Sequence, residues 1–338
     1  MTIPNQIELD VRSLITQDFK NFFTGQRILI TGASGLMGSY FTTLFQEFNI
    51  NFGGKSQLYV VSKSDRYPIS IHTSTSRLKM DLSEELNLDH LPKFDSIIHC
   101  AGYAQPSLFQ KSPLDTISVN SSSVLSLMKR VDQRGSFLFF SSSEVYSGLI
   151  RTPHKEIDIG NTNTNHPRSA YIESKRLGEA IICNANYHFP ELRSFAARLS
   201  LSYGPGFKSD DTRVINQFIT KAITKGCIEL MDSGSALRTY CYVADAVEMC
   251  IGILIFGNEK IYNVGGESRT SILGLANLIA EKTGASVVIP QTAEGGLAGS
   301  PNDVRLDLHR IKSLIGKQNF TSLDEGIQRS INWWNLNR

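Results

Sequence analysis

The chain has 338 residues, 41% of them hydrophobic and 20% charged, which is typical of a globular protein with a substantial core. Its 34 basic and 32 acidic residues give a net charge of +2, so it lacks the basic excess that drives binding to nucleic acid or an anionic membrane. The five cysteines are scattered and form no C-x-x-C pair, which argues against a disulfide framework and against a metal site.

The N-terminal region predicts a short helix ahead of the main domain. Apolar residues recur at roughly helical spacing over residues 8–23, although a mobile extension is the alternative. Residues 1–10 lack the basic and apolar regions of a secretory signal. No apolar run approaches the roughly 20 residues that span a bilayer, so we expect a cytoplasmic protein.

Short apolar strands and amphipathic helices alternate through the first two thirds of the chain. Strands are expected at 27–31, 58–61, 77–80, 96–100, 137–140 and 193–198, with helices at 38–47, 114–132 and 170–187. This alternation predicts an α/β fold with a Rossmann-type, doubly wound parallel sheet covered on both faces.

After Pro205 the pattern loosens and predicts a smaller, mixed α/β C-terminal lobe. Helices are expected at 213–225, 243–255, 271–282 and 322–334, and short strands at 228–231, 239–242, 260–264 and 286–289. We therefore divide the chain into an N-terminal helical extension (1–25), a cofactor-binding domain with the catalytic residues (26–200) and a mainly substrate-binding lobe (201–338). A return of the chain to the larger sheet is compatible with this division.

A glycine-rich turn joins the first strand to the first helix of the sheet. Gly32 permits a tight turn, Gly35 lets the backbone approach a pyrophosphate, and Gly38 permits close packing of the helix. Amide groups at the helix N-terminus would then face the phosphates. The strand before and the helix after this G-x-x-G-x-x-G spacing favour dinucleotide binding over a plain turn. The intervening residues expected at the cofactor are Ser34, Leu36 and Met37.

Residues at the ends of the next strands fit the same cofactor. Asp81-Leu82 closes the third strand, where a carboxylate could accept the adenine amino group, and Ala101-Gly102 closes the fourth, where small residues let a cofactor cross the sheet edge. Ser62-Lys63 replaces the acidic residue that usually holds the ribose hydroxyls after the second strand. A lysine there can accept a 2′-phosphate, or it can be part of a solvated loop. NAD is therefore expected, with NADP as the alternative.

Tyr171 and Lys175 are the candidate catalytic pair. Because they are four residues apart in a predicted helix, they lie on one helical face. A lysine ammonium beside a phenol favours the phenolate and lowers the pKa of the tyrosine, although such a spacing also occurs by chance in surface pairs. Ser142, Ser143 and Glu144 follow the fifth strand and so lie at the sheet edge where these folds bind ligands.

The order of these motifs resembles that of the extended short-chain dehydrogenase/reductases, and more narrowly that of the nucleotide-sugar epimerases, dehydratases and decarboxylases. The similarity extends from about residue 26 to the end of the chain. The shared motifs are Thr-Gly-x-x-Gly-x-x-Gly, Asp81-Leu82, His99-Cys-Ala-Gly102, Asn120, Ser-Ser-Ser-Glu-Val-Tyr146, Tyr171-x-x-x-Lys175 and Tyr203-Gly-Pro205.

The resemblance implies redox chemistry at C4 of a nucleotide sugar. Tyr171 would take the proton of the 4-hydroxyl while hydride passes from C4 to the nicotinamide. Lys175 would lower the pKa of Tyr171 and hold the nicotinamide ribose, with Asn120 also at the cofactor. Ser142 would hydrogen-bond the reacting oxygen, next to Ser143. The resulting 4-keto sugar acidifies C5 and weakens the bond to a C5 carboxylate.

Glu144 narrows the comparison, because simple 4-epimerases tend to have a small or neutral residue there. A glutamate resembles UDP-glucuronate decarboxylases, in which it would position or strain the C5 carboxylate, and 4,6-dehydratases, in which it would remove the C5 proton. Residues 167–171, 210–218 and 233–243 also resemble segments of the decarboxylases. By this resemblance Arg238 would bind the diphosphate or sugar, with Arg213 as a weaker anion-binding candidate.

Some residues remain open to more than one interpretation. Arg213 and Arg238 could be plain surface arginines, and Tyr103 could line the sugar pocket or merely pack. His99 lies in an apolar strand and is expected to be a core histidine. Leu201 stands where the related enzymes usually have an asparagine that contacts the substrate.

We expect UDP-glucuronate decarboxylase-like activity in a homodimer that binds a nucleotide sugar. The alternatives are a 4,6-dehydratase or 4-epimerase acting on another nucleotide sugar, and an NADPH-dependent 4-ketosugar reductase. A catalytically silent dinucleotide-binding regulator is the non-enzymatic alternative, against which the intact Ser142, Tyr171 and Lys175 set argues.

Overall fold

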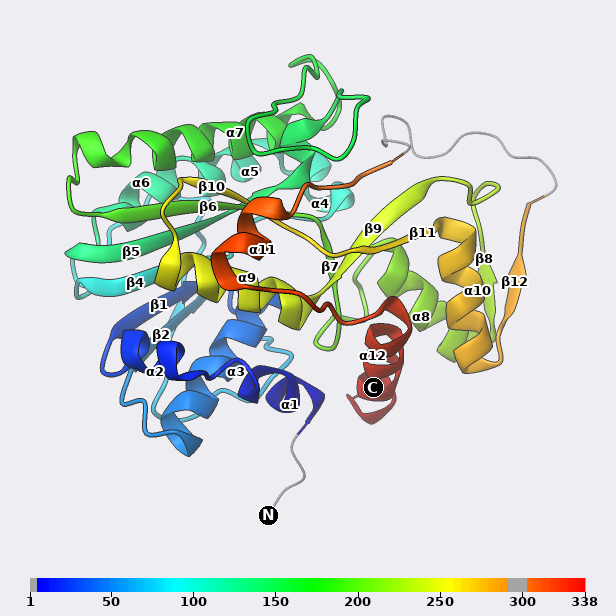
Figure 1. The fold of residues 1–338 in the computed structure, drawn as a ribbon, viewed down its shortest axis with the longest axis horizontal. Helices are drawn as coiled ribbons and strands as arrows, with labels where there is room; N and C mark the ends of the chain where they lie inside the picture. Colours follow the sequence, from blue (N-terminus) through cyan, green and yellow to red (C-terminus); the bar gives the residue numbers. More distant parts are fainter. Residues whose placement is uncertain (1–4, 291–302, 338) are drawn as a thin grey trace.

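The computed structural model describes residues 5–290 and 303–337, and its main element is a seven-stranded parallel sheet (Figure 1). The strand order β10-β6-β5-β4-β1-β2-β3 confirms the predicted doubly wound arrangement. The strands are β1 (Arg27–Thr31), β2 (Gln57–Ser62), β3 (Ser76–Lys79), β4 (Phe94–His99), β5 (Val131–Ser142), β6 (Arg193–Leu199) and β10 (Ile261–Val264).

Helices cover both faces of this sheet, as the continuous apolar strands require. In β1, Ile28 and Ile30 belong to one buried cluster and Leu29 to the other, because successive strand side chains point to opposite faces. The first cluster lies under α3 (Leu36–Asn51) and α9 (Val243–Phe256). The second lies under α5 (Pro113–Asn120), α6 (Ser122–Met128) and α7 (Ser169–Asn184).

The smaller lobe is mixed, as predicted, and contains a three-stranded sheet in the order β11-β9-β7 and a pair of strands, β12 and β8. β10 leaves this lobe and pairs with β6, so the chain returns to the larger sheet. No helix within the described residues is both long and apolar enough to cross a membrane. The elements of the lobe are β7 (Leu201–Tyr203), α8 (Val214–Lys225), β8 (Cys227–Glu229), β9 (Leu237–Tyr242), β11 (Ser268–Ser271), α10 (Ile272–Thr283), β12 (Ser286–Val288), α11 (His309–Ile315) and α12 (Leu323–Asn337).

Three predicted helices differ from the structure. The helix expected over 8–23 is two helices, α1 (Gln6–Arg12) and α2 (Gln17–Phe23), because the Thr16 hydroxyl caps the second by accepting from the Phe19 N–H (3.2 Å). The helix expected over 114–132 breaks at Ser121, which lies in a run of serines whose hydroxyls bond to nearby carbonyls. The helix expected over 170–187 ends earlier and is followed by a 3₁₀ turn (Ala185–Tyr187).

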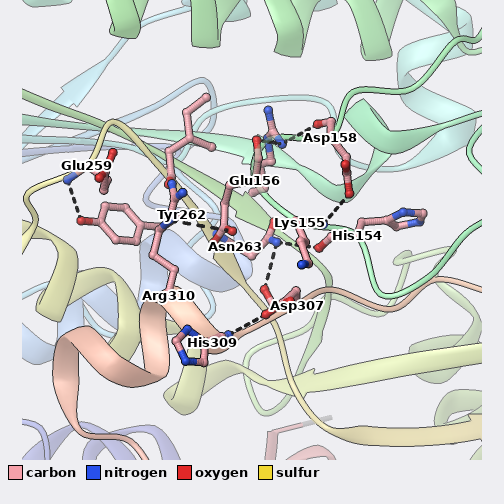
Figure 2. A network of polar contacts seen from close by, with 12 residues as sticks. His154, Lys155, Glu156, Asp158, Glu259, Tyr262, Asn263, Asp307, His309 and Arg310 are labelled. Atoms are coloured by element: carbon pink, nitrogen blue, oxygen red, sulfur yellow. Dashed lines mark hydrogen bonds and ion pairs between the residues drawn. The ribbon is translucent and has the colours of Figure 1, made fainter.

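Asn263 in β10 anchors the edge of the sheet to two loops (Figure 2). Its side-chain amide donates to the carbonyl oxygens of His154 (2.9 Å) and Asp307 (3.0 Å), and its backbone N–H donates to the carboxylate of Glu156 (3.0 Å). Its amide oxygen accepts from the Tyr146 hydroxyl (2.6 Å). Tyr146 closes the 3₁₀ helix η1 (Ser143–Tyr146), so this network fixes the segment that contains Glu144.

Arg198 supports the same segment from inside the sheet. Its guanidinium donates two hydrogen bonds to Glu179 (2.7 and 2.8 Å) and one to the Tyr146 hydroxyl (2.8 Å). The side chains of Arg198 and Glu179 are almost fully buried. A buried ion pair of this kind stabilises little by itself, but breaking it leaves one charge without a partner.

We therefore expect Glu179→Leu to lower the free energy of unfolding by about 3–5 kcal/mol, because it strands the Arg198 guanidinium. The double variant Glu179→Leu with Arg198→Met should lose clearly less, since both charges are removed together. Urea unfolding of the parent, of the single variants Glu179→Leu and Arg198→Met, and of the double variant measures both effects. A double variant at least as unstable as the sum of the single variants would contradict this role for the pair.

Candidate active site

The glycine turn forms a tight backbone cradle between β1 and α3. Gly32 has a φ of 67°, in the left-handed region that favours glycine. Gly35 precedes the first residue of α3, and its N–H donates to the Gly32 carbonyl (2.9 Å). A Cβ on Gly38 would lie 2.2 Å from that same carbonyl oxygen, so α3 can begin this close to β1 only with glycine there. Leu36 and Met37 lie buried in the first turn of α3.

Lys63, Asp81 and Tyr103 lie together at the ends of β2, β3 and β4. The ammonium of Lys63 pairs with the carboxylate of Asp81 (2.5 Å) and donates to the Tyr103 hydroxyl (3.4 Å). Burial acts to raise the pKa of Asp81, but hydrogen bonds from Lys63 and Ser83 outweigh it and leave that pKa below its usual value. Tyr103 thus contacts Lys63, a candidate cofactor residue.

Other predicted cofactor residues lie beside this group. Ser62 is buried at the end of β2 and donates to the Ser34 hydroxyl of the glycine turn (2.8 Å). Leu82 is buried, and its carbonyl accepts from Ser123. The backbone N–H of Ala101 donates to the Thr31 hydroxyl (3.2 Å), so the end of β4 is bonded to the start of the turn.

Lys175 is fully enclosed where β4, β5 and α7 meet. Its ammonium donates to the amide oxygen of Asn120 (2.8 Å) and to the carbonyl oxygen of Phe140 (2.6 Å). Burial lowers the pKa of Lys175 to about 7. Gly102 lies directly over the ammonium, because a Cβ there would be 3.5 Å from it. The amide group of Asn120 in turn donates to the Ser174 hydroxyl, so its orientation is fixed.

Tyr171 lies on the same face of α7, with the Lys175 ammonium 5.7 Å from its ring centre. Burial raises the pKa of Tyr171 to about 12, while a hydrogen bond with Ser142 acts to lower it and the charge of Glu144 to raise it. The sequence predicts that Lys175 lowers this pKa, but burial of the phenol dominates and raises the pKa instead. The Phe109 ring stacks on the Tyr171 ring at 4.7 Å, nearly parallel to it.

Glu144 is held by a residue that the sequence analysis did not select. Arg168 donates to both carboxylate oxygens of Glu144, at 2.5 and 3.0 Å, and its guanidinium also lies over the Phe109 ring at 5.3 Å. Glu144, Arg168, Phe109 and Tyr171 therefore form one continuous group. Ser142 accepts from the Glu144 N–H (3.2 Å), and Ser143 begins the same 3₁₀ helix.

The two candidate anion-binding arginines differ in their partners. Arg213 donates to both oxygens of Asp211, so its guanidinium is already paired within the protein. Arg238 in β9 is partly buried and donates to its neighbour's carbonyl, and it has no carboxylate within ion-pairing distance among residues 5–290 and 303–337. Burial lowers its pKa, and the charges of Glu144 and Arg168 both act on it. Leu201 lies in β7, opposite Tyr240 of β9, and is 37% exposed.

His99 is a core residue, as expected, but its hydrogen bonds join two parts of the site. The ring nitrogens contact the Thr31 hydroxyl (Nδ1, 2.7 Å) and the Val119 carbonyl (Nε2, 3.0 Å). Burial lowers the pKa of His99 to about 4, so the ring is neutral and Nε2 donates to the carbonyl. The glycine turn and the end of α5, next to Asn120, are thereby connected.

We expect Lys175→Met to change how stability depends on pH in the cofactor-free protein. The folded pKa of Lys175, about 7, is below the 10.5 of a free lysine, so between these values the unfolded chain binds more protons. Lys175 therefore makes the parent's free energy of unfolding rise with pH across this window, relative to Lys175→Met. Urea unfolding of both proteins from about pH 6.5 to 9 measures the difference; a difference that stays constant would contradict the burial of this ammonium.

Comparisons with known proteins identify relatives of the chain by sequence and by fold. UDP-glucuronic acid decarboxylase 6 of Arabidopsis thaliana is 29% identical over 91% of this chain and 88% of its own length. The structure resembles epimerase Mth375 of Methanothermobacter thermautotrophicus with a TM-score of 0.81 and 21% identity, over 96% of this chain and 98% of that one. It also resembles MoeE5 in complex with UDP-glucuronic acid and NAD, with a TM-score of 0.73 and 25% identity, over 92% of this chain and 100% of that one. Residues 28–265 match the model of one family, and the chain belongs to it: the NAD dependent epimerase/dehydratase family.

Proposed function

We propose that the chain binds NAD across the glycine turn, with NADP as the alternative. The cradle at Gly32, Gly35 and Gly38 lets the turn, the start of α3 and the end of β4 lie close together, since a Cβ at these glycines would meet neighbouring backbone atoms. A pyrophosphate would then face the N-terminus of α3. Asp81, held below its usual pKa, suits the adenine amino group. Lys63 lies beside it with its side chain exposed, where it could also meet a 2′-phosphate. When bound, the nicotinamide supplies a reversible acceptor for one hydride.

The catalytic proposal assigns oxidation of the sugar C4 to Tyr171, Lys175 and Ser142. Tyr171 takes the proton of the 4-hydroxyl as the C4–H bond breaks, and Ser142 hydrogen-bonds the same oxygen. The Lys175 ammonium donates to Asn120 and Phe140, which leaves its third N–H for a ribose hydroxyl, and it places positive charge near the phenolate. The product of this step is a 4-keto sugar.

The Glu144–Arg168 pair favours decarboxylation as the second step, and it is the observation on which the choice of reaction depends. A dehydratase needs a free base at C5, whereas both oxygens of Glu144 accept from Arg168. The fixed pair instead suits a role in positioning the C5 carboxylate of the sugar, with the C5–carboxylate bond aligned to the C4 carbonyl. The C5–carboxylate bond then breaks, carbon dioxide leaves, and the electron pair passes into the C4 carbonyl. C5 then takes a proton from solvent, the hydride returns to C4, and Tyr171 gives its proton back to the C4 oxygen, which completes the cycle.

In this proposal Arg238 binds an anionic group of the substrate. Its partly buried guanidinium has no carboxylate partner in the described part of the chain, and it lies near the charges of Glu144 and Arg168. An anionic group, either the diphosphate or the sugar carboxylate, satisfies it. UDP-glucuronate contains both. The similarity to the Arabidopsis decarboxylase supports the same substrate.

A 4-epimerase acting on a nucleotide sugar is the second candidate. Leu201 replaces the asparagine that the decarboxylases usually place at the substrate, and its side chain is 37% exposed. A substrate that differs from UDP-glucuronate would explain this change. MoeE5, which this structure resembles, is seen with UDP-glucose as well as with UDP-glucuronic acid, and this supports a substrate other than UDP-glucuronate.

Incubation of the protein with UDP-glucuronate and a panel of other nucleotide sugars tests the proposal. We expect a UDP-pentose whose mass shows loss of carbon dioxide, with a reaction rate reduced by about 100-fold or more in Tyr171→Phe because the base is removed. Mass analysis of products and of the dinucleotide released on denaturation measures both. Loss of water would indicate a dehydratase, and an unchanged mass with altered stereochemistry an epimerase. Full activity of Tyr171→Phe would contradict the catalytic assignment.

We also propose that the chain forms a homodimer through the outer surfaces of α5, α6 and α7. Apolar side chains gather there although they are exposed, and α5 and α7 pack side by side (Figure 1). Covering such a surface removes apolar area from water. The exposed residues are Leu114 (75%), Ile117 (37%), Leu125 (49%) and Leu177 (47%).

Replacing Leu114 and Leu177 together by glutamate should therefore convert the dimer to a monomer, since charged groups cannot be desolvated there without a partner. Light scattering coupled to size-exclusion chromatography measures the mass in solution. Ile150→Glu is a matched control, because Ile150 is 98% exposed in a loop outside these helices, and it should remain dimeric. A monomeric parent, or a dimeric double variant, would refute the assigned surface.

A further inference from the structure

Asp10 in the N-terminal helix α1 is a buried carboxylate that the proposed chemistry does not use. It is 5% exposed and accepts four hydrogen bonds: from Gln6 (2.8 Å), Tyr40 (2.9 Å), Tyr242 (2.5 Å) and Arg329 (2.8 Å). We call these five residues the Asp10 cluster. Because all four donor groups bind the same carboxylate, that carboxylate fixes how far the four donor side chains lie from one another.

The Asp10 cluster joins parts of the chain that belong to different halves of the site. Tyr40 lies in α3, which begins at the glycine turn, and Tyr242 is the last residue of β9, the strand that contains Arg238. Arg329 lies in α12, near the other end of the chain. Two buried tyrosines from the two halves therefore donate to the same carboxylate oxygen of Asp10.

The apolar side of α1 occupies the same junction. Ile7 and Val11 are fully buried, and a Cβ on Gly206 would lie 3.2 Å from the Ile7 side chain and 3.7 Å from that of Leu36. The loop after β7 thus packs against both α1 and the first turn of α3. α1 precedes residue 28, where the match to the family model begins.

Burying a carboxylate to attach a helix costs desolvation free energy. Burial alone disfavours the charged form, and apolar contacts such as those of Ile7 would hold α1 at lower cost. The carboxylate adds directional hydrogen bonds, because each donor must point at one of its two oxygens. A shift of β9 relative to α3 therefore breaks at least one charge-assisted hydrogen bond. The arrangement is thus better suited to fixing positions than to adding stability.

We propose that Asp10 is a positioning residue that fixes β9, and with it Arg238, relative to α3 and the dinucleotide turn. The N-terminal helix then acts on substrate binding without touching the substrate. This inference rests on the proposed role of Arg238 at the nucleotide sugar. It predicts that loosening the β9 side of the Asp10 cluster weakens sugar binding, whereas loosening the α3 side weakens dinucleotide binding.

Tyr242→Phe and Tyr40→Phe form a matched pair for the test, because each keeps its buried ring and removes one hydroxyl. Tyr242→Phe should raise KM for UDP-glucuronate about tenfold, with kcat changed by less than about twofold and dinucleotide affinity unchanged. Tyr40→Phe should instead weaken dinucleotide binding. Arg12→Gln removes only the α1 ion pair with Glu47 (2.6 Å), on α3, and should leave all three quantities within about twofold.

Hydrogen exchange of the full-length protein provides a readout that does not depend on turnover. The peptide over 237–242 should exchange faster in Tyr242→Phe than in the parent or in Arg12→Gln. If Tyr242→Phe lowers thermal stability but leaves KM and exchange over 237–242 unchanged, Asp10 has a structural role only and the inference is wrong. If the parent turns over none of the nucleotide sugars, the proposed function fails, while the exchange result still decides whether Asp10 positions β9.

Discussion

The buried Lys175 ammonium determines how the site is assembled. Its two hydrogen bonds join α7 to Asn120 at the end of α5 and to the Phe140 carbonyl in β5, and Gly102 after β4 closes over it. An ammonium removed from water is stable only when such acceptors are present, so α5, β5 and α7 must keep these positions. Tyr171, one turn earlier in α7, and Ser142, two residues beyond Phe140, are placed by the same constraint.

This burial also explains why the two members of the pair have pKa values far from those of free side chains. Desolvation lowers the pKa of Lys175 to about 7 and raises that of Tyr171 to about 12, because it penalises the charged form of each. At neutral pH the Tyr171 side chain is therefore a neutral phenol. In the proposed reaction a base is needed only once the substrate and an oxidised nicotinamide are bound, and the positive charge of that nicotinamide would favour the phenolate.

Local patterns predicted the parts of the site that lie within one strand, turn or helix. The glycine spacing before α3, the Tyr171–Lys175 spacing and the Ser142–Glu144 segment after β5 are all of this kind. Arg168, Phe109 and the four donors to Asp10 were missed, because their roles depend on residues far away in the sequence. The break at Ser121 and the cap at Thr16 were missed for a different reason: the apolar period continues across both.

The central claim, that the site oxidises C4 of a nucleotide sugar, is tested most directly with UDP-glucuronate deuterated at C4. The holoenzyme would be mixed with this sugar and quenched with acid within one turnover, and the released dinucleotide analysed by mass. The account predicts deuterium in the reduced nicotinamide early in the turnover, and none of it in Tyr171→Phe. Formation of product by the parent with no deuterium in the dinucleotide at any time would contradict it.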